Sequence, residues 1–469
     1  MPWITCAGFL LGWMALSFRR GWLLPLFLPV AYLGILFAFI KITRVWRDVM
    51  NPLSLVIIIG FVRFFVPGLL LLSGAEPPDE IENFFLLMQL SNNDWLWGHA
   101  LALIGILAVI FGWVLIQPRE IITRSLRLHL LGSTKYASIA AMLVGFMALS
   151  AFFLMNASIG AILSGSFRGT TVQVGTGKYF FLAYLLIVGS VFLCCCLLST
   201  GYKWISLMPS GIAMLLYWPL GGRGRAVISV LCGMILLWYV NREQKGWSKL
   251  TVRAIQLVKA LVIGIFIILV FYIGSHYRGD PDERALSSGL SMIGLWSYLK
   301  GSVYSDLGQL HSLAGAIEIG PAVLGGQTFT GSLSWPLSEF LPIQGRSAGV
   351  YIVEVLVGLQ DDHKWGVNAT LIGDAYLNFG LWSIPIIMAS YGALLKIIYL
   401  RFRQGVLHIA IYVLALVYGM QILWGSIEVW PQALTVLCFA FAVHMLGNTV
   451  FNLREKSSRS RIAPIGGLQ

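Results

Sequence analysis

Apolar stretches of about 18–25 residues recur along this chain, and each is long enough to cross a hydrocarbon core about 30 Å thick. Of the 469 residues, 58% are hydrophobic and only 11% are charged, a composition that excludes a soluble globular domain. The fold class is therefore all-α, a polytopic membrane bundle of about twelve spans. We predict them at 2–18, 21–40, 51–73, 97–117, 135–157, 179–200, 204–220, 226–240, 254–275, 371–395, 405–425 and 432–450.

The orientation of the bundle follows from the distribution of Lys and Arg. With the N-terminus inside, cytoplasmic Lys and Arg fall within residues 41–47, 119–135, 203, 242–253, 396–403 and 454–461. The opposite loop at 74–96 holds acidic residues and no Lys or Arg. This asymmetry follows the positive-inside rule and predicts that both termini are cytoplasmic. The net charge of +12 is therefore explained by topology, and no nucleic-acid partner is predicted.

One outer loop is far longer than the others, and it divides the chain. We predict an N-terminal membrane bundle of nine spans at 1–275, a large helical loop at 276–370, three spans at 371–450 and a cytoplasmic tail at 451–469. Long loops in compact proteins are usually functional. In this one, apolar residues repeat at helical spacing over 303–317, and 348–359 is an apolar run too short to span. We expect the loop to fold onto the bundle as a lid, with an amphipathic helix and a re-entrant or interfacial segment.

Arginines on the outer side are few, and most have glycine close by. Glycine lets a ligand approach the backbone, and the guanidinium fork suits phosphate. The stretch Gly221-Gly222-Arg223-Gly224-Arg225 is the densest example. As a set they predict a site for an anionic ligand such as a lipid pyrophosphate; the alternative is contact with lipid head groups or with nearby acids. The candidates are Arg168, Arg223, Arg225, Arg278, Arg284 and Arg346.

Candidate acid–base groups lie in or beside the same loop. Asp374 is predicted one turn inside the span at 371–395, where a carboxylate is costly and is a functional candidate; an ion pair with an arginine is the alternative. Asp306, at the start of the amphipathic helix, is a second candidate base or a solvated residue. His311 and Glu318 are seven apart and share a helix face, which favours a polar-face position for His311 over a general base. Arg63 is predicted to form a structural pair inside the bundle.

Aromatic and cysteine residues give weaker signals. Tyr304, Trp335 and Tyr376 could stack on sugar rings, although interfacial belts use the same residue types. All six cysteines fall inside predicted spans, and no metal-ligand spacing is present. No cofactor and no metal site are predicted.

Four stretches resemble bacterial O-antigen and enterobacterial-common-antigen polymerases of the Wzy type, which polymerise lipid-linked oligosaccharide repeat units. They are "NPLSLVIIIGFVRFFVPGLL", "GGRGRAVISVL", "GQTFTGSLSWPLSEFLPIQGRS" and "NATLIGDAYLNFGLWSI". The chain departs from the family pattern in two places. Leu341-Pro342 is followed by Ile343-Gln344-Gly345-Arg346 instead of an immediate basic residue, and Asp374 stands where the family usually has Glu.

The resemblance implies a GT-C-like inner-membrane enzyme with its active site on the periplasmic side. It implies transfer of a glycan from undecaprenyl pyrophosphate to the sugar hydroxyl of a second lipid-linked unit, and a chain-length-regulating co-polymerase as a possible partner. Asp306 or Asp374 would activate the hydroxyl, and Arg278 and Arg346 would assist catalysis. Arg168, Arg223 and Arg225 would bind pyrophosphate, and His311 would join the three aromatics at the sugar.

Two other functions remain open. An O-antigen ligase would use the same donor. The His-Asn pair typical of ligases at the start of the span after the long loop is replaced here by Asn368-Ala369. A transporter or flippase of lipid-linked oligosaccharide usually has repeated halves and charges at mid-membrane, and no internal repeat is evident in this sequence.

Overall fold

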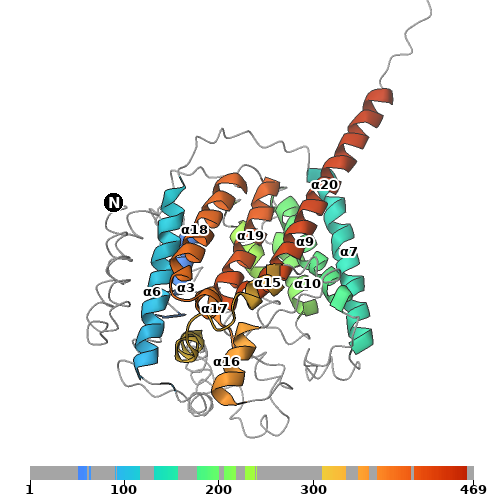
Figure 1. Ribbon diagram of the computed structural model, residues 1–469. Coiled ribbons are helices and arrows are strands. Elements are labelled where there is room, and N and C mark those ends of the chain that lie inside the picture. Colours follow the sequence, from blue (N-terminus) through green and yellow to red (C-terminus); the bar gives the residue numbers. More distant parts are fainter. Residues whose placement is uncertain are drawn as a thin grey trace, which may run out of the picture. The chain divides into compact units, whose positions relative to one another are not determined.

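A computed structural model describes residues 51–60, 63–64, 90, 92–116, 131–156, 177–199, 205–217, 228–237, 239, 309–333, 347–358, 367–402 and 406–461. All regular structure in these ranges is helical (Figure 1). Six of the described helices are long and apolar enough to cross a membrane. They are α6 (Asn92–Leu115), α7 (Leu131–Asn156), α9 (Gly177–Ser199), α18 (Ser383–Phe402), α19 (Val406–Gly425) and α20 (Trp430–Arg461). The all-α prediction is confirmed for the described residues, which carry the helices of a multi-pass membrane protein.

Shorter helices occupy other predicted spans. These are α3 (Pro52–Gly60), η3 (Ile205–Leu207) with α10 (Met208–Tyr217), and a helix at 228–237. The predicted spans at 2–18, 21–40 and 254–275 lie outside the described residues. Helix α20 runs past the predicted span end at 450 into the predicted tail.

The predicted span at 371–395 is wrong as a single helix. Helix α17 (Thr370–Phe379) ends at Gly380, which has a φ of 80°, and α18 begins three residues later. Glycine adopts positive φ at little cost, so the chain can turn there. The Ser383 hydroxyl donates to the Gly380 carbonyl at 2.7 Å and to the Ala375 carbonyl at 2.9 Å, which satisfies groups that the break exposes. Asp374 therefore lies in a short separate helix and not inside a spanning one.

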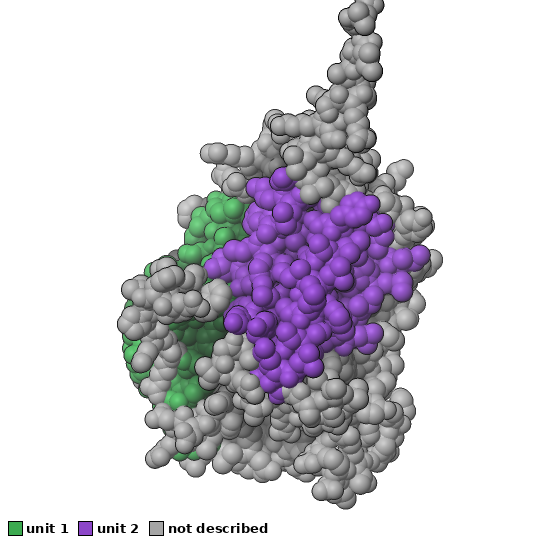
Figure 2. Space-filling model, turned by 90° about the vertical axis from the view of Figure 1, so that its right-hand side faces the viewer, with its two compact units in different colours: residues 1–120, 250–400, 418–431 green, residues 121–249, 401–417, 432–469 purple. Residues whose placement is uncertain are grey.

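The chain forms two compact units, which Figure 2 colours separately. Unit 1 comprises residues 1–120, 250–400 and 418–431, and unit 2 comprises 121–249, 401–417 and 432–469. In unit 2, α7 and α9 pack antiparallel through small residues. A Cβ at Gly145 would collide with the Leu186 backbone, and one at Gly189 would lie 2.7 Å from the Ser138 carbonyl. Close backbone approach of this kind is how helices pack in lipid.

In unit 1, α6 and α18 run in the same direction and also touch through glycines. A Cβ at Gly112 would collide with the Ala389 carbonyl, and one at Gly392 would collide with the Val109 carbonyl. Further along both helices, the Trp113 and Tyr399 rings lie 5.5 Å apart. A Cβ at Gly105 would lie 3.6 Å from Met388, so from Gly105–Met388 to Trp113–Tyr399 the position numbers rise together and the two helices are parallel.

Buried polar side chains differ sharply between the units. Among the described residues of unit 2, the buried polar side chains are Ser and Thr, which can hydrogen-bond to backbone carbonyls, and tyrosines such as the hydrogen-bonded pair Tyr239 and Tyr412. Every buried amide, imidazole and carboxyl side chain among the described residues lies in unit 1: Asn51, Asp94, His99, Gln309, His311, Asp374 and Asn378. Such groups are costly in an apolar interior. Because these groups are concentrated in unit 1, a functional site is expected there.

Candidate functional site

A helix at residues 309–319 lies at the centre of the polar region of unit 1. Its neighbours are α6, α17 and α16 (Ala348–Val357), which place Gly98 against Ala314, Gly373 against Leu313, and Gly315 against Ile352. Covered on these sides, residues 309–316 are all buried. The enclosure comes from three elements distant in sequence, so spacing alone could not reveal it.

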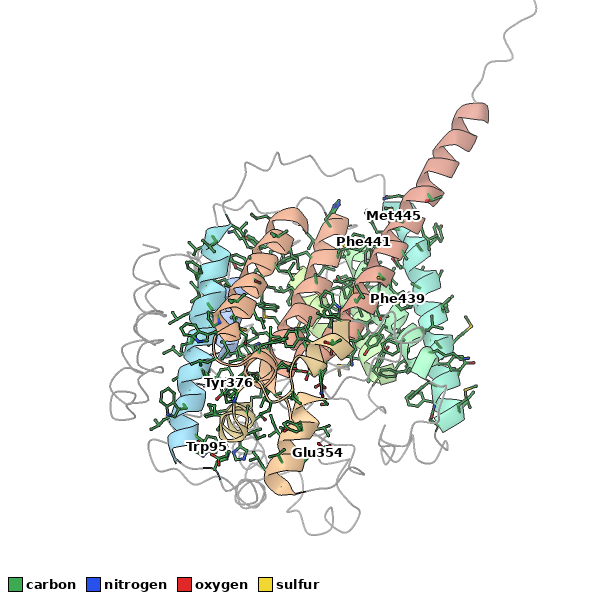
Figure 3. The ribbon with its side chains drawn as sticks, in the orientation of Figure 1. Trp95, Glu354, Tyr376, Phe439, Phe441 and Met445 are labelled. Atoms are coloured by element: carbon green, nitrogen blue, oxygen red, sulfur yellow. The ribbon has the colours of Figure 1, made fainter. Side chains whose placement is uncertain are left out.

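His311 lies in this enclosed part of the helix and is fully buried. The predicted polar-face position is therefore wrong, although Glu318, two turns on, is exposed as expected. The imidazole packs against Trp95 of α6, with ring centroids 4.7 Å apart (Figure 3). Burial lowers the pKa of His311 to about 3, so the ring is neutral at pH 7.

Helix α17 is short and buried, and several of the polar backbone groups at its ends are paired. The Tyr376 carbonyl accepts the backbone N–H groups of Ala322 at 3.0 Å and Gly380 at 2.8 Å, and the Leu377 carbonyl accepts that of Leu324 at 2.9 Å. At the other end, the Thr370 hydroxyl accepts the Gly373 N–H at 3.2 Å. Helix ends buried without such partners would be strongly destabilising, so these contacts allow α17 to end inside the protein.

Asp374 projects from α17 and has no exposed surface. One carboxyl oxygen, Oδ2, accepts the Ile427 N–H at 3.1 Å, and Oδ1 accepts the Asn378 side-chain amide at 2.9 Å. Burial raises the pKa of Asp374 to about 8, and repulsion from the Glu428 carboxylate adds to the effect, whereas hydrogen bonds from Ile427, Thr328 and Asn378 oppose it. A carboxyl group with this pKa gains and loses a proton near neutral pH.

Residues 426–428, the segment between α19 and α20, join α17 to α16. Ile427 binds Asp374, and the Glu428 side chain binds the first turn of α16. Glu428 Oε1 accepts the Ala348 N–H at 2.9 Å and Oε2 accepts the Ser347 hydroxyl at 3.0 Å. Ser347 in turn caps α16 by accepting the Val350 N–H at 3.3 Å. A carboxylate at a helix N-terminus also interacts favourably with the helix dipole.

Backbone strain is found in the same place. Ser426 has a φ of 147° and Thr370 a φ of 58°, values that side chains with a Cβ rarely adopt. The Ser426 hydroxyl accepts the Glu428 N–H at 3.1 Å, which helps to hold this conformation. Strained residues persist where the surroundings impose them, and they cluster at functional sites.

Trp424 lies immediately before this segment and contacts several elements of unit 1. Its carbonyl accepts the Gln309 side-chain amide at 2.9 Å, and its ring packs against Phe64 with centroids 5.6 Å apart. The Arg63 guanidinium lies 5.7 Å from the Trp424 ring centroid, so it is held by a cation–π contact. The residue two positions before this segment is thus fixed by these contacts to the helix at 309–319 and to Arg63 and Phe64, and not to α16 or α17.

Three of the residues predicted from sequence as site residues are described, and all belong to unit 1. Asp374 and Tyr376 come from α17, and His311 comes from the helix at 309–319. Tyr376 is buried, with 7% of its surface exposed, so it is no open platform for a sugar in this conformation (Figure 3). The other predicted site residues lie outside the described residues: Asp306, Tyr304, Trp335, Arg168, Arg223, Arg225, Arg278 and Arg346.

Glu428 is a candidate that the sequence analysis missed. It is the one acidic residue between the predicted spans at 405–425 and 432–450, within "GSIEVWP". An isolated acid in an otherwise apolar hairpin is a usable signal, because a charge there needs a partner. The partner is over 80 positions away in the sequence, however, and only the fold identifies it.

Comparisons with protein-family models, curated proteins and solved structures find no match for this chain. Among the residues that the structure describes, no three His, Cys, Asp or Glu side chains are close enough to share a metal ion. Functional assignment therefore depends on the residues of this chain.

Replacing Ser347 with alanine is expected to loosen the start of α16. The change removes the cap on the Val350 N–H and a hydrogen-bond donor to Glu428. Loss of an N-cap costs about 1 kcal/mol, which corresponds to roughly five-fold faster hydrogen exchange of the first-turn amides. Exchange followed by mass spectrometry in detergent would measure it, with the amides of α17 as the internal control. Unchanged exchange in α16 would show that the cap contributes nothing.

Proposed function

We propose that the chain is a membrane glycosyltransferase that polymerises undecaprenyl-pyrophosphate-linked oligosaccharide repeat units. The observation that carries the proposal is the pair of carboxyl groups, Asp374 and Glu428, joined by the Asp374–Ile427 hydrogen bond in the unit that holds every buried amide, imidazole and carboxyl side chain among the described residues. Sugar transfer from a pyrophosphate needs a proton acceptor for the attacking hydroxyl and charge stabilisation for the leaving group. An acid–base site of this kind supplies the first requirement.

The resemblance to Wzy-type polymerases supports the same assignment, because three of its four stretches include elements of unit 1. The stretch at 51–70 includes Arg63, and the stretch at 326–347 includes α15 (Gln327–Leu333) and Ser347. The stretch at 368–384 includes all of α17. Segments spread over more than 300 positions thus contribute to one compact unit.

Glu428 is the base in this proposal because its side chain is only partly buried, whereas Asp374 is closed off. The Glu428 carboxylate takes the proton of the acceptor sugar hydroxyl. The hydroxyl oxygen bonds to the anomeric carbon of the donor glycan, and the bond from that carbon to the pyrophosphate oxygen breaks. The electron pair leaves with undecaprenyl pyrophosphate, so atoms and charge balance.

Asp374 acts as a positioning residue through its hydrogen bond to Ile427, next to the base. The arginines named from sequence, Arg168, Arg223, Arg225, Arg278 and Arg346, remain the proposed binders and stabilisers of pyrophosphate. The aromatics Tyr304 and Trp335 remain proposed sugar contacts, as do Tyr376 and His311 after movement of the helices that bury them.

The finer features of membrane placement belong to the same proposal. Twelve spans and a GT-C-like arrangement place both termini in the cytoplasm and the segment 426–428 on the periplasmic side of the inner membrane. This sidedness follows from the alternation of basic and acidic loops. Lipid-linked donor and acceptor would reach the site there, and a chain-length-regulating co-polymerase is a proposed partner.

A transporter of lipid-linked oligosaccharide is a second candidate, favoured by the break between α17 and α18 beside a buried carboxyl group. Interrupted helices of this kind form substrate sites in many transporters. A ligase is the third alternative, since it would use the same donor.

Deletion of the gene in its bacterial host, followed by gel analysis of surface polysaccharide, separates these functions. We expect core bearing a single repeat unit, with the ladder of longer chains lost. Core with no repeat unit, together with polymer on the periplasmic carrier, would indicate a ligase. Repeat units retained on the cytoplasmic side would indicate a flippase. An unchanged ladder would overturn the glycan assignment altogether.

A further inference from the structure

An exposed apolar surface surrounds the break between α17 and α18. It consists of Pro321, Ala322 and Val323 from one loop and Phe379 and Trp382 from the break, and we call it the loop surface. Val323, Phe379 and Trp382 expose 45%, 47% and 67% of their area, respectively. The two segments touch, because a Cβ on Gly380 would lie 3.6 Å from Pro321 and 3.9 Å from Ala322. Exposed apolar residues gathered in one place usually mark an interaction surface.

Part of the backbone of this loop is hydrogen-bonded within the protein. The N–H groups of Ala322 and Leu324 bind carbonyls of α17, and the Gln327 N–H binds the Leu324 carbonyl at 3.0 Å. Residues 319–333 include no charged side chain. Loops normally stay in water because burying their free backbone groups is costly. These hydrogen bonds lower that cost for the groups that they pair.

The loop surface continues onto the exposed side of α18. Trp382 precedes the candidate span Ser383–Leu400, and exposed residues follow at positions 386, 390, 394 and 397. This spacing of three or four residues forms one helix face, and Ile386, Leu394 and Ile397 on it are apolar. Only 33% of this span is buried in the protein. Tryptophan at the end of such a span is typical of the membrane–water interface.

We propose that the loop surface inserts into the interfacial layer of the lipid bilayer. The partner is the membrane lipid itself, since the surface is uncharged and continuous with a membrane-spanning helix face. Helix α17 then lies at head-group depth, and a lipid head group can approach the partly buried Glu428 sideways from the bilayer. The proposal goes beyond the proposed function and does not depend on it.

Spin labels read by electron paramagnetic resonance test the depth of this surface in lipid nanodiscs. Single cysteines replace Val323 and Trp382 in a chain whose Cys6 and Cys438 are serine; the buried cysteines at 194–196 and 232 are shielded from the label. Leu394→Cys is the control within lipid, and Glu318→Cys, just before the loop, is the control in water. The chain without an added cysteine gives the background signal.

We expect labels at 323 and 382 to show a ratio of oxygen to water-soluble nickel-chelate accessibility between those of the two controls. A label at 323 with the same ratio as the one at 318 would overturn the proposal, because the loop would then lie in water. Low accessibility to both reagents at 323 would also overturn it, since that result would mean that protein covers the surface. The labels occupy exposed positions, so folding is expected to be retained, and elution as a single species checks it.

Discussion

The Glu428→Gln variant is expected to form polymer more slowly by a factor on the order of 100 to 10,000, the usual contribution of a general base. Glutamine has the same shape, keeps an oxygen acceptor for the Ala348 N–H and offers its amide to the Ser347 hydroxyl. The N-terminus of α16 should therefore stay in place while the proton acceptor is lost. Polymer formed by membranes from cells that lack the chromosomal copy would measure the loss.

Glu354→Gln is the matched control for this variant. Glu354 lies on the same helix, α16, and is also partly buried, but it stands about two turns beyond Ser347, away from the first turn that Glu428 binds (Figure 3). We expect wild-type polymer from it. Wild-type polymer from Glu428→Gln as well would exclude Glu428 as the base, and poor insertion of that variant alone would indicate a structural role instead.

The Asp374→Asn variant is expected to gain stability relative to the wild type as pH rises. The pKa of Asp374 is about 8 in the folded chain, whereas an ordinary Asp side chain has a pKa of 3.8, so between these pH values the folded state binds a proton that the unfolded state does not. Stability of the wild type therefore falls as pH rises through this window and levels off above pH 8. Asparagine has no such proton to lose. The stability difference should grow by roughly 1 kcal/mol per pH unit.

Reaction of the buried cysteines with a fluorescent thiol reagent during heating would report unfolding at pH 5, 7 and 9. At pH 5 the asparagine variant should be slightly less stable, because its amide cannot accept both hydrogen bonds that the carboxyl group accepts. A stability difference that does not change with pH would contradict a raised pKa. The same variant should keep most of its polymerase activity, whereas Asp374→Ala should lose it through displacement of residues 426–428.

The membrane-spanning helices were predictable because hydrophobicity over a window of about 20 residues is a local property. The ends of α9 and α19 lie within a few residues of the predicted bounds at 179–200 and 405–425. The break at Gly380 was not predicted, since apolar residues continue on both sides of it and hide the turn. Glycine occurs at 50 positions in this chain, so glycine alone does not mark a break.

A candidate site residue was predictable where the sequence alone shows that burying it costs free energy. Asp374 stood out because a carboxylate in an apolar stretch is expensive wherever it lies, and the structure does bury it. His311 was also named, but its burial was not predicted, because the helix pattern suggested one open face while three other helices enclose it. Glu428 was overlooked because its importance depends on the first turn of α16.

The sequence by itself determined that this is an all-α membrane chain with polar groups gathered near one long loop. The length of an apolar span, and the free-energy cost of a charged residue within it, depend only on residues that are close in sequence. Only the tertiary structure decided which polar groups meet. The Asp374–Ile427 and Glu428–Ser347 hydrogen bonds join positions 53 and 81 apart. Such contacts depend on how helices pack, and helix packing is set by close backbone approach at residues such as Gly112 and Gly392.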